Sequence, residues 1–464
     1  MKARSYSIDV FMQGVARILG GFFSFIAVFL LTYLFSESEI GEYNLILSTV
    51  NIIASLSTLW LSQSVLRYYD ENKDLGAVIL LLGASTIAGI CAYLIFNVFA
   101  DQTHSIWPYA YIVLMVFYNV FDAVFRRARR LKDYVMLELL LAIGRVFPML
   151  FLAKLTHDYN MIFASQCIVV AFFLVYLLIK EHEAFKTTNY SVSKRMFRQY
   201  MKFGLPLMGL AISNWFLTTS DRYIIKFYDS NKEVGIYSTN YNLANSIYMM
   251  FSLIVVNAYH PIIMKEWNKD KKETLHLVSH ALDLYIMLMV PVTFYGCLKS
   301  NILLGLFKGN LYASQYWIFN WTALGIFFYG ISLLFHKFYE LTQRTNVILL
   351  LNIIAALSNI IMNFTMIPFW GYGIAAFTTF LSYIIYILIV RLLTFRKFKV
   401  HINTKILTIS ISSAAFFGFF DHFLIKDNNI ITFFIEGIVY VIYTAFVYQT
   451  FGILKLKKIR NIFH

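Results

Sequence analysis

Charged residues are scarce in this sequence. Asp, Glu, Lys and Arg make up 14% of its 464 residues, whereas soluble domains carry about 25%. Hydrophobic residues account for 59%, and the mean hydropathy is +0.65. A soluble fold could not bury this much apolar surface, because single cores stop growing beyond about 250–300 residues. The low charge excludes an ordinary soluble protein and predicts one embedded in a lipid bilayer.

Cysteine is scarce as well. Cys91, Cys167 and Cys297 all lie in apolar stretches, and we interpret them as small buried hydrophobic residues. An odd number without metal-ligand spacing excludes a disulfide framework and a zinc site. Catalytic, phosphate-binding and metal-ligand motifs are also missing, so the sequence predicts neither an enzyme nor a cofactor. We expect no cleavable signal peptide, because the first apolar run is too long and lacks a cleavage site.

Long apolar stretches are abundant instead. A membrane-spanning helix needs about 20 mostly apolar residues. The sequence therefore predicts an all-α integral membrane protein with about fourteen transmembrane helices. The predicted spans are residues 10–34, 43–65, 76–99, 107–125, 135–153, 161–179, 203–220, 237–259, 277–298, 316–335, 346–367, 372–393, 405–420 and 430–452.

Lys and Arg are concentrated in alternate loops between these spans. With a cytoplasmic N-terminus, most of the 39 Lys and Arg residues fall in cytoplasmic loops, as the positive-inside rule requires. The sequence thus predicts that both termini are cytoplasmic. The net charge of +14 is then explained by basic residues in short loops beside the anionic inner leaflet. We therefore expect no nucleic-acid partner. In the linker of residues 181–202, Lys194, Arg195, Arg198 and Lys202 are interleaved with apolar residues, which is typical of an amphipathic helix on the inner membrane surface.

A short motif occurs twice. The sequence of residues 39–43, Glu-Ile-Gly-Glu-Tyr, is matched at residues 233–237 by Glu-Val-Gly-Ile-Tyr, and a polar stripe follows each copy. Chance similarity of turn residues is the alternative explanation. A true repeat predicts two pseudo-symmetric six-helix bundles in the same orientation. The predicted parts are the first bundle, a basic cytoplasmic linker, the second bundle, and two additional helices with a basic tail: residues 1–180, 181–202, 203–394 and 395–464.

Several charged residues lie within or at the ends of predicted spans, where charge is costly unless it meets water or a partner. Arg145 follows Glu138 by two helical turns, which fits either a structural ion pair or an anion-binding arginine. Arg17 either reaches the inner surface or lines a cavity. Arginine suits a diphosphate, because its planar fork pairs with phosphate oxygens. The predicted substrate-binding residues are Arg17, Arg67, Arg145 and Arg222, with Glu138 and Asp221 as coupling candidates.

Asparagines form further polar stripes within the spans. Asn51 and Asn245 occupy equivalent positions in the two copies of the repeat, and Asn359 and Asn363 share one helix face. Such amides either hydrogen-bond neighbouring helices or line a hydrated cavity. We include all four as cavity candidates.

Three stretches resemble the polysaccharide transporter family of oligosaccharide flippases, within the multidrug/oligosaccharidyl-lipid/polysaccharide exporter superfamily. They are residues 39–43 with the Ser-Val-Leu-Arg sequence at 64–67, residues 221–225 (Asp-Arg-Tyr-Ile-Ile) with 233–238, and residues 359–376. Their order and spacing cover nearly the whole chain. The residue match carries over Arg67, Asp221 and Arg222, whereas Arg17 and Arg145 rest on the physical argument alone.

The resemblance implies a flippase of the bacterial cytoplasmic membrane. Its substrate would be a polyprenyl-diphosphate-linked oligosaccharide, moved by alternating access to the outer leaflet for capsule- or O-antigen-type assembly. The implied partners are this lipid-linked oligosaccharide, membrane lipids and other polysaccharide-assembly proteins.

Two other functions compete. A multidrug exporter of the same superfamily would need a cation-binding carboxylate within a span, and Asp9, Asp283 and Glu436 are the candidates. A membrane polymerase or glycosyltransferase would need an outside loop bearing catalytic acids or arginines. The longest such loop, residues 299–315, contains no acidic residue, which disfavours the enzyme.

Overall fold

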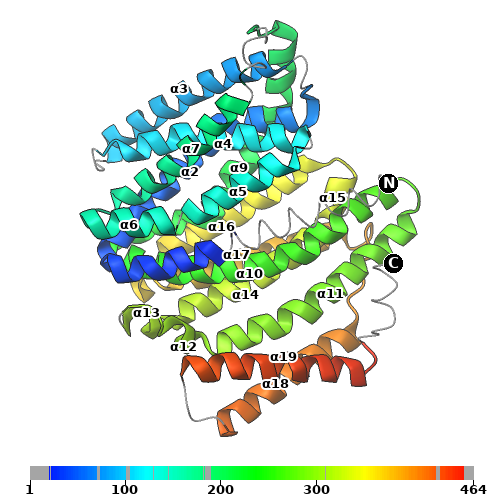
Figure 1. Ribbon diagram of the computed structural model, residues 1–464. Helices are drawn as coiled ribbons and strands as arrows, with labels where there is room; N and C mark the ends of the chain where they lie inside the picture. The colour runs from blue at the N-terminus through cyan, green and yellow to red at the C-terminus, as the bar shows by residue number, and fades with distance from the viewer. Residues whose placement is uncertain are drawn as a thin grey trace. The chain divides into compact units, whose positions relative to one another are not determined.

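The computed structural model describes residues 20, 22–70, 74–100, 105–128, 130–144, 146–180, 182, 190–308, 310–424 and 429–453. Arg17 and Arg145 lie outside these residues. The described helices (Figure 1) are α2 (Glu37–Tyr68), α3 (Leu75–Ala100), α4 (Trp107–Arg127), α5 (Leu131–Gly144), α6 (Phe147–Thr156), α7 (Asn160–Lys180), α9 (Lys194–Tyr228), α10 (Asn231–Glu266), α11 (Lys271–Leu298), α12 (Ser300–Leu304), α13 (Asn310–Ser314), α14 (Tyr316–Phe335), α15 (Lys337–Leu341), α16 (Thr345–Trp370), α17 (Ile374–Thr394), α18 (Thr404–Leu424) and α19 (Ile430–Thr450).

The described chain contains eleven helical segments that are long and apolar enough to cross a membrane. They are α2, α3, α4, α7, α10, α11, the α14–α15 segment, and α16 to α19. A shorter apolar helix, Phe22–Leu34, covers the described end of the first predicted span. The prediction of an all-α, multi-pass membrane protein is confirmed.

Two predicted spans differ in detail. The fifth, residues 135–153, forms two helices, α5 and α6, and Pro148 lies in the first turn of α6, where its missing N–H costs no hydrogen bond. The seventh, residues 203–220, belongs to α9, a continuous helix of 35 residues. Ser193 caps this helix by accepting a hydrogen bond from the Met196 N–H. The last part of the predicted linker therefore forms the first turns of α9.

The chain divides into two compact units, Met1–Ser238 and Thr239–His464. In the first unit, α2 packs against α3, α4 and α9, and α4 packs against α7. At Gly204 on α9, a Cβ atom would overlap the backbone of Trp60, so the α2 and α9 backbones lie in direct contact. The Ser64 hydroxyl donates to the Tyr200 carbonyl across the same pair (2.9 Å). The predicted division into two six-helix bundles remains a prediction.

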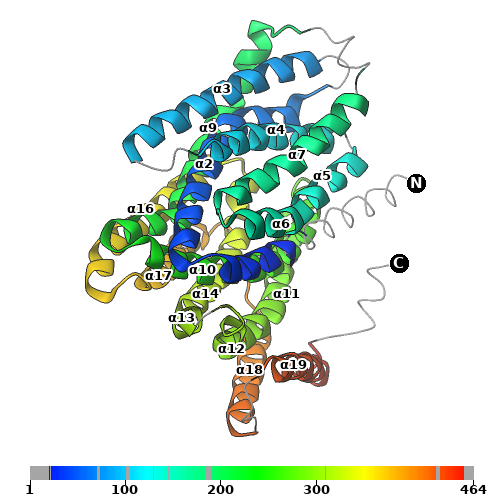
Figure 2. The ribbon, with the colours of Figure 1, turned by 60° about the vertical axis from the view of Figure 1, so that its left-hand side comes forward.

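In the second unit, α14 packs against α11 and α17, and α16 packs against α17. The fully buried Tyr285 of α11 donates its hydroxyl hydrogen to the Phe327 carbonyl of α14 at 2.9 Å. α18 packs against α11 and α19, and α18 and α19 lie side by side in Figures 1 and 2. The outward phenylalanines of this pair, such as Phe419 and Phe434, are each 62% exposed, as expected for side chains that face lipid.

The two copies of the repeated motif meet in the first unit, at the starts of α2 and α10. A Cβ atom at Gly41 would overlap the backbone oxygen of Asn231 and lie 2.9 Å from the backbone nitrogen of Gly235. Reciprocally, a Cβ at Gly235 would overlap the backbone oxygen of Glu37. Equivalent glycines thus permit the backbones to touch, which gives the two copies the same structural role.

The equivalence extends upstream of the motif. The Ser36 hydroxyl caps α2 and donates to the Glu39 carboxylate at 2.7 Å, in a capping box. The Ser230 hydroxyl donates to the Glu233 carboxylate in the same way before α10. Each copy therefore begins with serine and glutamate in matching positions.

Candidate functional site

Asp221 and Arg222 lie in the last turns of α9 and are deeply buried, with exposures of 0% and 6%. The Tyr237 hydroxyl donates to Asp221 Oδ2 at 2.5 Å, and Arg222 Nε donates to the Ser238 hydroxyl at 3.1 Å. Two consecutive residues of α9 thus bond two consecutive residues of α10. Because buried charges are costly without hydrogen bonds, these contacts stabilise the pair in place.

The next residue of α9 connects the site to α2. The Tyr223 hydroxyl shares a hydrogen bond with the Thr49 hydroxyl (2.6 Å) and donates to the Leu45 carbonyl at 3.2 Å. About two helical turns before it, Trp215 Nε1 donates to the Ser48 carbonyl at 3.2 Å. We call the set Thr49, Asp221, Arg222, Tyr223, Tyr237 and Ser238 the three-helix junction. It joins α2, α9 and the start of α10 within the first unit.

Arg67 lies at the opposite end of α2 and is exposed. Its guanidinium carbon sits 4.5 Å from the Phe203 ring centroid and 5.4 Å from that of Tyr68, in cation–π geometry. Thr49 and Arg67 are separated by roughly 27 Å along the helix, at 1.5 Å per residue. The structure therefore does not bring Arg67 and Arg222 together in one site.

The acidic partner proposed for Arg145 has a described contact elsewhere. Glu138 of α5 is half-buried, and its Oε1 accepts a hydrogen bond from the Tyr118 hydroxyl of α4 at 2.8 Å. Arg145 and Arg17 lie outside the described residues, so their predicted roles remain predictions.

The asparagine candidates divide into two groups. Asn51 of α2 and Asn245 of α10 are half-buried. Asn359 and Asn363 of α16 are fully buried. Asn359 Nδ2 donates to the Thr379 hydroxyl of α17 (3.1 Å), and Asn363 Nδ2 donates to Asn359 Oδ1 (3.2 Å). These contacts favour interhelical hydrogen bonding over a cavity lining for the pair on α16.

The carboxylates that an exporter would need are engaged where they are described. Glu436 of α19 is 6% exposed, and its Oε2 lies 2.6 Å from Lys299 Nζ, which also lies 2.7 Å from Asp421 Oδ1. Burial alone would lower the pKa of Lys299, but the hydrogen bonds to both carboxylates raise it. Asp283 accepts a hydrogen bond from the Asn403 N–H at 3.1 Å. Asp9 lies outside the described residues.

Sequence analysis missed a second polar cluster, in the second unit. Lys337 Nζ lies 2.5 Å from Glu340 Oε2 and 2.9 Å from His260 Nδ1, while His336 bonds both Glu340 and the Tyr386 hydroxyl. The helical spacing of His336 and Glu340 was a visible signal. Their partners on α10 and α17 are distant in sequence and gave none. The partners Tyr237 and Ser238 of the three-helix junction were within a quoted motif but carried no assigned role.

Sequence and structure comparisons identify relatives of the chain. The family model described as "Polysaccharide biosynthesis protein" matches residues 8–267, and the MatE model matches residues 206–365. No curated protein sequence matches the chain.

Several solved structures share the fold. The lipid II flippase MurJ, in an inward closed conformation, is similar with a TM-score of 0.74 and 16% identity, over 96% of this chain and 98% of that chain. An inward-facing multidrug resistance transporter of the MATE family has a TM-score of 0.57 and 13% identity, over 82% and 95%. The Vibrio cholerae MATE transporter VcmN in its bent form has a TM-score of 0.52 and 11% identity, over 89% and 98%.

These structural similarities establish the fold, and the first family model covers more than half of the 464 residues. The chain belongs to the polysaccharide biosynthesis protein family, within the multidrug/oligosaccharidyl-lipid/polysaccharide exporter superfamily of membrane transporters.

Proposed function

We propose that the protein is a flippase for a polyprenyl-diphosphate-linked oligosaccharide, which it moves from the cytoplasmic to the outer leaflet for surface polysaccharide assembly. One observation carries the proposal: a chain of the polysaccharide biosynthesis family has the fold of a lipid II flippase along 96% of its length. Its membrane would be the bacterial cytoplasmic membrane, with both termini inside. Alternating access, as in the sequence-based expectation, would deliver the cargo.

Arg67 is the described arginine best suited to meet a diphosphate. It is exposed at the end of α2 that the positive-inside rule predicts to be cytoplasmic, where the lipid-linked substrate would be loaded. The rings of Phe203 and Tyr68 orient its guanidinium, which leaves the planar fork able to pair with phosphate oxygens. Arg222 is buried and hydrogen-bonded, so its part is to hold the three-helix junction unless the chain rearranges. Arg17 and Arg145 complete the proposed set.

Reconstitution tests the proposal directly. Purified protein would be placed in liposomes with a fluorescent polyprenyl-diphosphate oligosaccharide, and the fraction accessible in the outer leaflet would be followed with time. We expect translocation by the wild-type protein and a loss of at least about tenfold in Arg67→Ala, the effect of removing one charge-assisted contact. Arg344→Ala is the matched control, because Arg344 is exposed in the connection before α16.

The possible outcomes distinguish a failure of the proposed flippase function from a failure of Arg67 as its binding residue. Translocation that is equal in wild type and Arg67→Ala would keep the flippase and reject Arg67. Absence of translocation with several glycan lipids would reject the flippase.

A second candidate is a multidrug exporter that is driven by a coupling cation. The MatE match over residues 206–365 favours it. The engagement of Glu436 by Lys299 and of Asp283 by Asn403 weighs against it, because a coupling carboxylate must exchange its cation. Cation-driven efflux of a fluorescent dye from the same liposomes, with no lipid translocation, would establish the exporter instead.

A further inference from the structure

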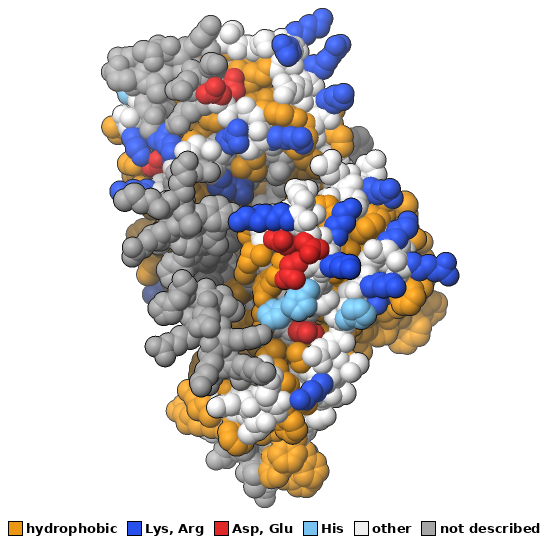
Figure 3. All heavy atoms as spheres, turned by 90° about the vertical axis from the view of Figure 1, so that its right-hand side faces the viewer, with side chains coloured by type: hydrophobic (Ala, Val, Ile, Leu, Met, Phe, Trp, Pro, Cys, Tyr) orange, Lys and Arg blue, Asp and Glu red, His pale blue; other side chains and the backbone are white. Residues whose placement is uncertain are grey.

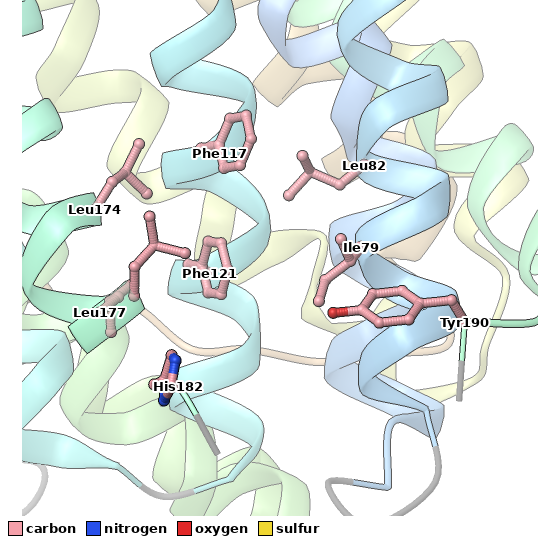
Figure 4. Close-up of a pocket in the computed structure, with 9 residues that line it drawn as sticks. Ile79, Leu82, Phe117, Phe121, Leu174, Leu177, His182 and Tyr190 are labelled. Atoms are coloured by element: carbon pink, nitrogen blue, oxygen red, sulfur yellow. The ribbon is translucent and has the colours of Figure 1, made fainter. Parts of the chain in front are cut away.

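A pocket of about 540 Å³ lies within the first unit, between α3, α4 and α7. Both α3 and α7 pack against α4. The ring of Tyr93 on α3 lies 4.7 Å from that of Tyr109 on α4, and the ring of Phe173 on α7 lies 6.0 Å from that of Phe125 on α4. Figure 4 shows apolar side chains entering the pocket from all three helices. We call it the α3–α7 groove, and its apolar walls are Ile79, Leu82, Phe117, Phe121, Leu174, Leu177 and Leu178.

The groove has one polar end. His182, just beyond α7, and Tyr190, just before α9, lie there, and Figure 4 shows the Tyr190 hydroxyl directed toward the pocket interior. A tyrosine hydroxyl donates one hydrogen bond, and an imidazole ring donates at least one in either tautomer. The pocket thus combines a long apolar wall with hydrogen-bond donors at one end, and its volume is within the range of ligand sites.

The groove spans about one leaflet. Leu174 precedes His182 by about 12 Å of helix, at 1.5 Å per residue, against a hydrocarbon core of about 30 Å. The helices of the groove also expose apolar side chains, namely the wall residue Leu178 on α7 (59% exposed) and Ile87 on α3 (65% exposed), as expected for helices that face lipid. The positive-inside rule predicts that the His182 end lies at the cytoplasmic surface. A hydrocarbon chain could therefore enter sideways from the inner leaflet.

The charge around the polar end is predominantly positive. At the ends of α4 and α7, Arg126, Arg127, Arg130 and Lys180 outnumber their carboxylate partners Asp122 and Asp133. The first turns of α9, four residues after Tyr190, add exposed cations around a hollow of about 590 Å³: Lys194, Arg195, Arg198 and Lys202. Figure 3 shows many exposed Lys and Arg side chains on one face of the molecule. Cations in this position attract anionic headgroups.

We propose that the α3–α7 groove binds one acyl chain of an anionic phospholipid from the cytoplasmic leaflet. The acyl chain lies between the apolar walls, and the phosphate lies at the His182 and Tyr190 end, beside the basic start of α9. A chain of one leaflet's length fits the depth of the groove, whereas a polyprenyl chain is far longer. The inference does not depend on the transport function, because it rests on the groove and its charge.

Lipid binding by the wild-type protein is the first test. The full chain would be purified in detergent, incubated with phosphatidylglycerol or with phosphatidylcholine of identical chains, and examined by native mass spectrometry without any cargo lipid. We expect one retained phosphatidylglycerol, at an occupancy about tenfold above that of phosphatidylcholine, since a cationic surface discriminates by headgroup charge. Equal retention of both lipids would overturn the proposal, because the headgroup end would then play no part.

Filling the groove is the second test. Leu174→Trp places a large ring in the pocket. We expect phosphatidylglycerol occupancy to fall at least about tenfold, because the ring would displace roughly two methylene groups of the acyl chain from their buried positions. Ile87→Trp, on the lipid-facing side of α3, is the matched control and should retain the lipid. Unchanged occupancy in a monodisperse Leu174→Trp protein would refute the site. Displacement of phosphatidylglycerol by polyprenyl phosphate would also refute it, by assigning the groove to the cargo. Should Leu174→Trp fail to fold, the headgroup comparison still decides.

Discussion

The two ends of α2 differ in the exposure of the charged residues beside them. Near Ser36, the helix crosses α10 at paired glycines, and the three-helix junction bonds it to α9 through the Tyr223 hydroxyl. Near Tyr68, α2 touches α9 at Trp60 and Gly204, and the Ser64 hydroxyl donates to the Tyr200 carbonyl. Beyond these contacts, Arg67 lies over the Tyr68 and Phe203 rings, which are 5.6 Å apart. Touching backbones and directional hydrogen bonds thus fix both ends. At the second end, however, a charged side chain, Arg67, is exposed and lies against aromatic rings.

The charged residues at the two ends of α2 differ in how accessible they are to a ligand. The charges at the first end, Asp221 and Arg222, are buried and hydrogen-bonded, so a ligand would have to displace existing partners to reach them. Arg67 at the second end is exposed and held only by ring faces. We therefore expect different roles for residues that belong to the same family-resembling stretches. Substitutions at the first end should reduce stability, and those at Arg67 should reduce transport.

The largest effect is expected at the glycine crossing. Gly41→Ala should lower the free energy of unfolding by about 3 kcal/mol, the upper end of typical overpacking costs, because the obstructing atoms belong to the backbone. Gly83→Ala is the matched control: no atom lies within 4 Å of its Cβ position in α3, so it should raise stability by about 0.5–1 kcal/mol. Thermal unfolding in detergent measures both. Equal stability of the two variants would show that the crossing of α2 and α10 tolerates an added methyl group.

The next largest effect concerns the buried carboxylate. Tyr237→Phe removes the hydroxyl that donates to Asp221, and we expect a loss of about 2 kcal/mol, typical of a hydrogen bond to a charged group. A double-mutant cycle with Asp221→Asn isolates the coupling between the two side chains. Tyr316→Phe, at the exposed start of α14, provides the control for a lost hydroxyl. Additive losses in the cycle would contradict a direct role for this contact.

Sequence reasoning predicted the membrane fold because hydropathy and loop charge are properties of contiguous segments. It could not predict the partners of Asp221 or Lys299, since these depend on how distant helices meet. A polar stripe shows which residues share a face, but not what that face contacts, and so Asn359 and Asn363 were grouped with cavity candidates. The basic linker was separated from α9 because its charges lower hydropathy, although they leave helix propensity intact.

A smaller loss is expected where α9 meets α2. Tyr223→Phe removes the hydrogen bonds to Thr49 and to the Leu45 carbonyl, and it should lower the free energy of unfolding by about 1 kcal/mol. Thr49→Val should cost a similar amount, and the double variant should cost little more than either one, because both remove the same contact. The measurement is urea or thermal unfolding in the same detergent. Strict additivity would mean that the two hydroxyls act independently.

The smallest stability effect, and the sharpest test of the comparison, is expected for Arg67→Lys. The ammonium keeps the positive charge and a cation–π contact with Phe203, so stability should change by no more than about 0.5–1 kcal/mol. Lysine lacks the planar fork that pairs with two phosphate oxygens, so the KM for the polyprenyl-diphosphate substrate should rise severalfold in liposomes. Arg67→Ala should raise it further. If lysine supported transport at the wild-type KM, only the charge at this end of α2 would matter, and the aromatic surroundings of Arg67 would not serve to orient a bidentate contact.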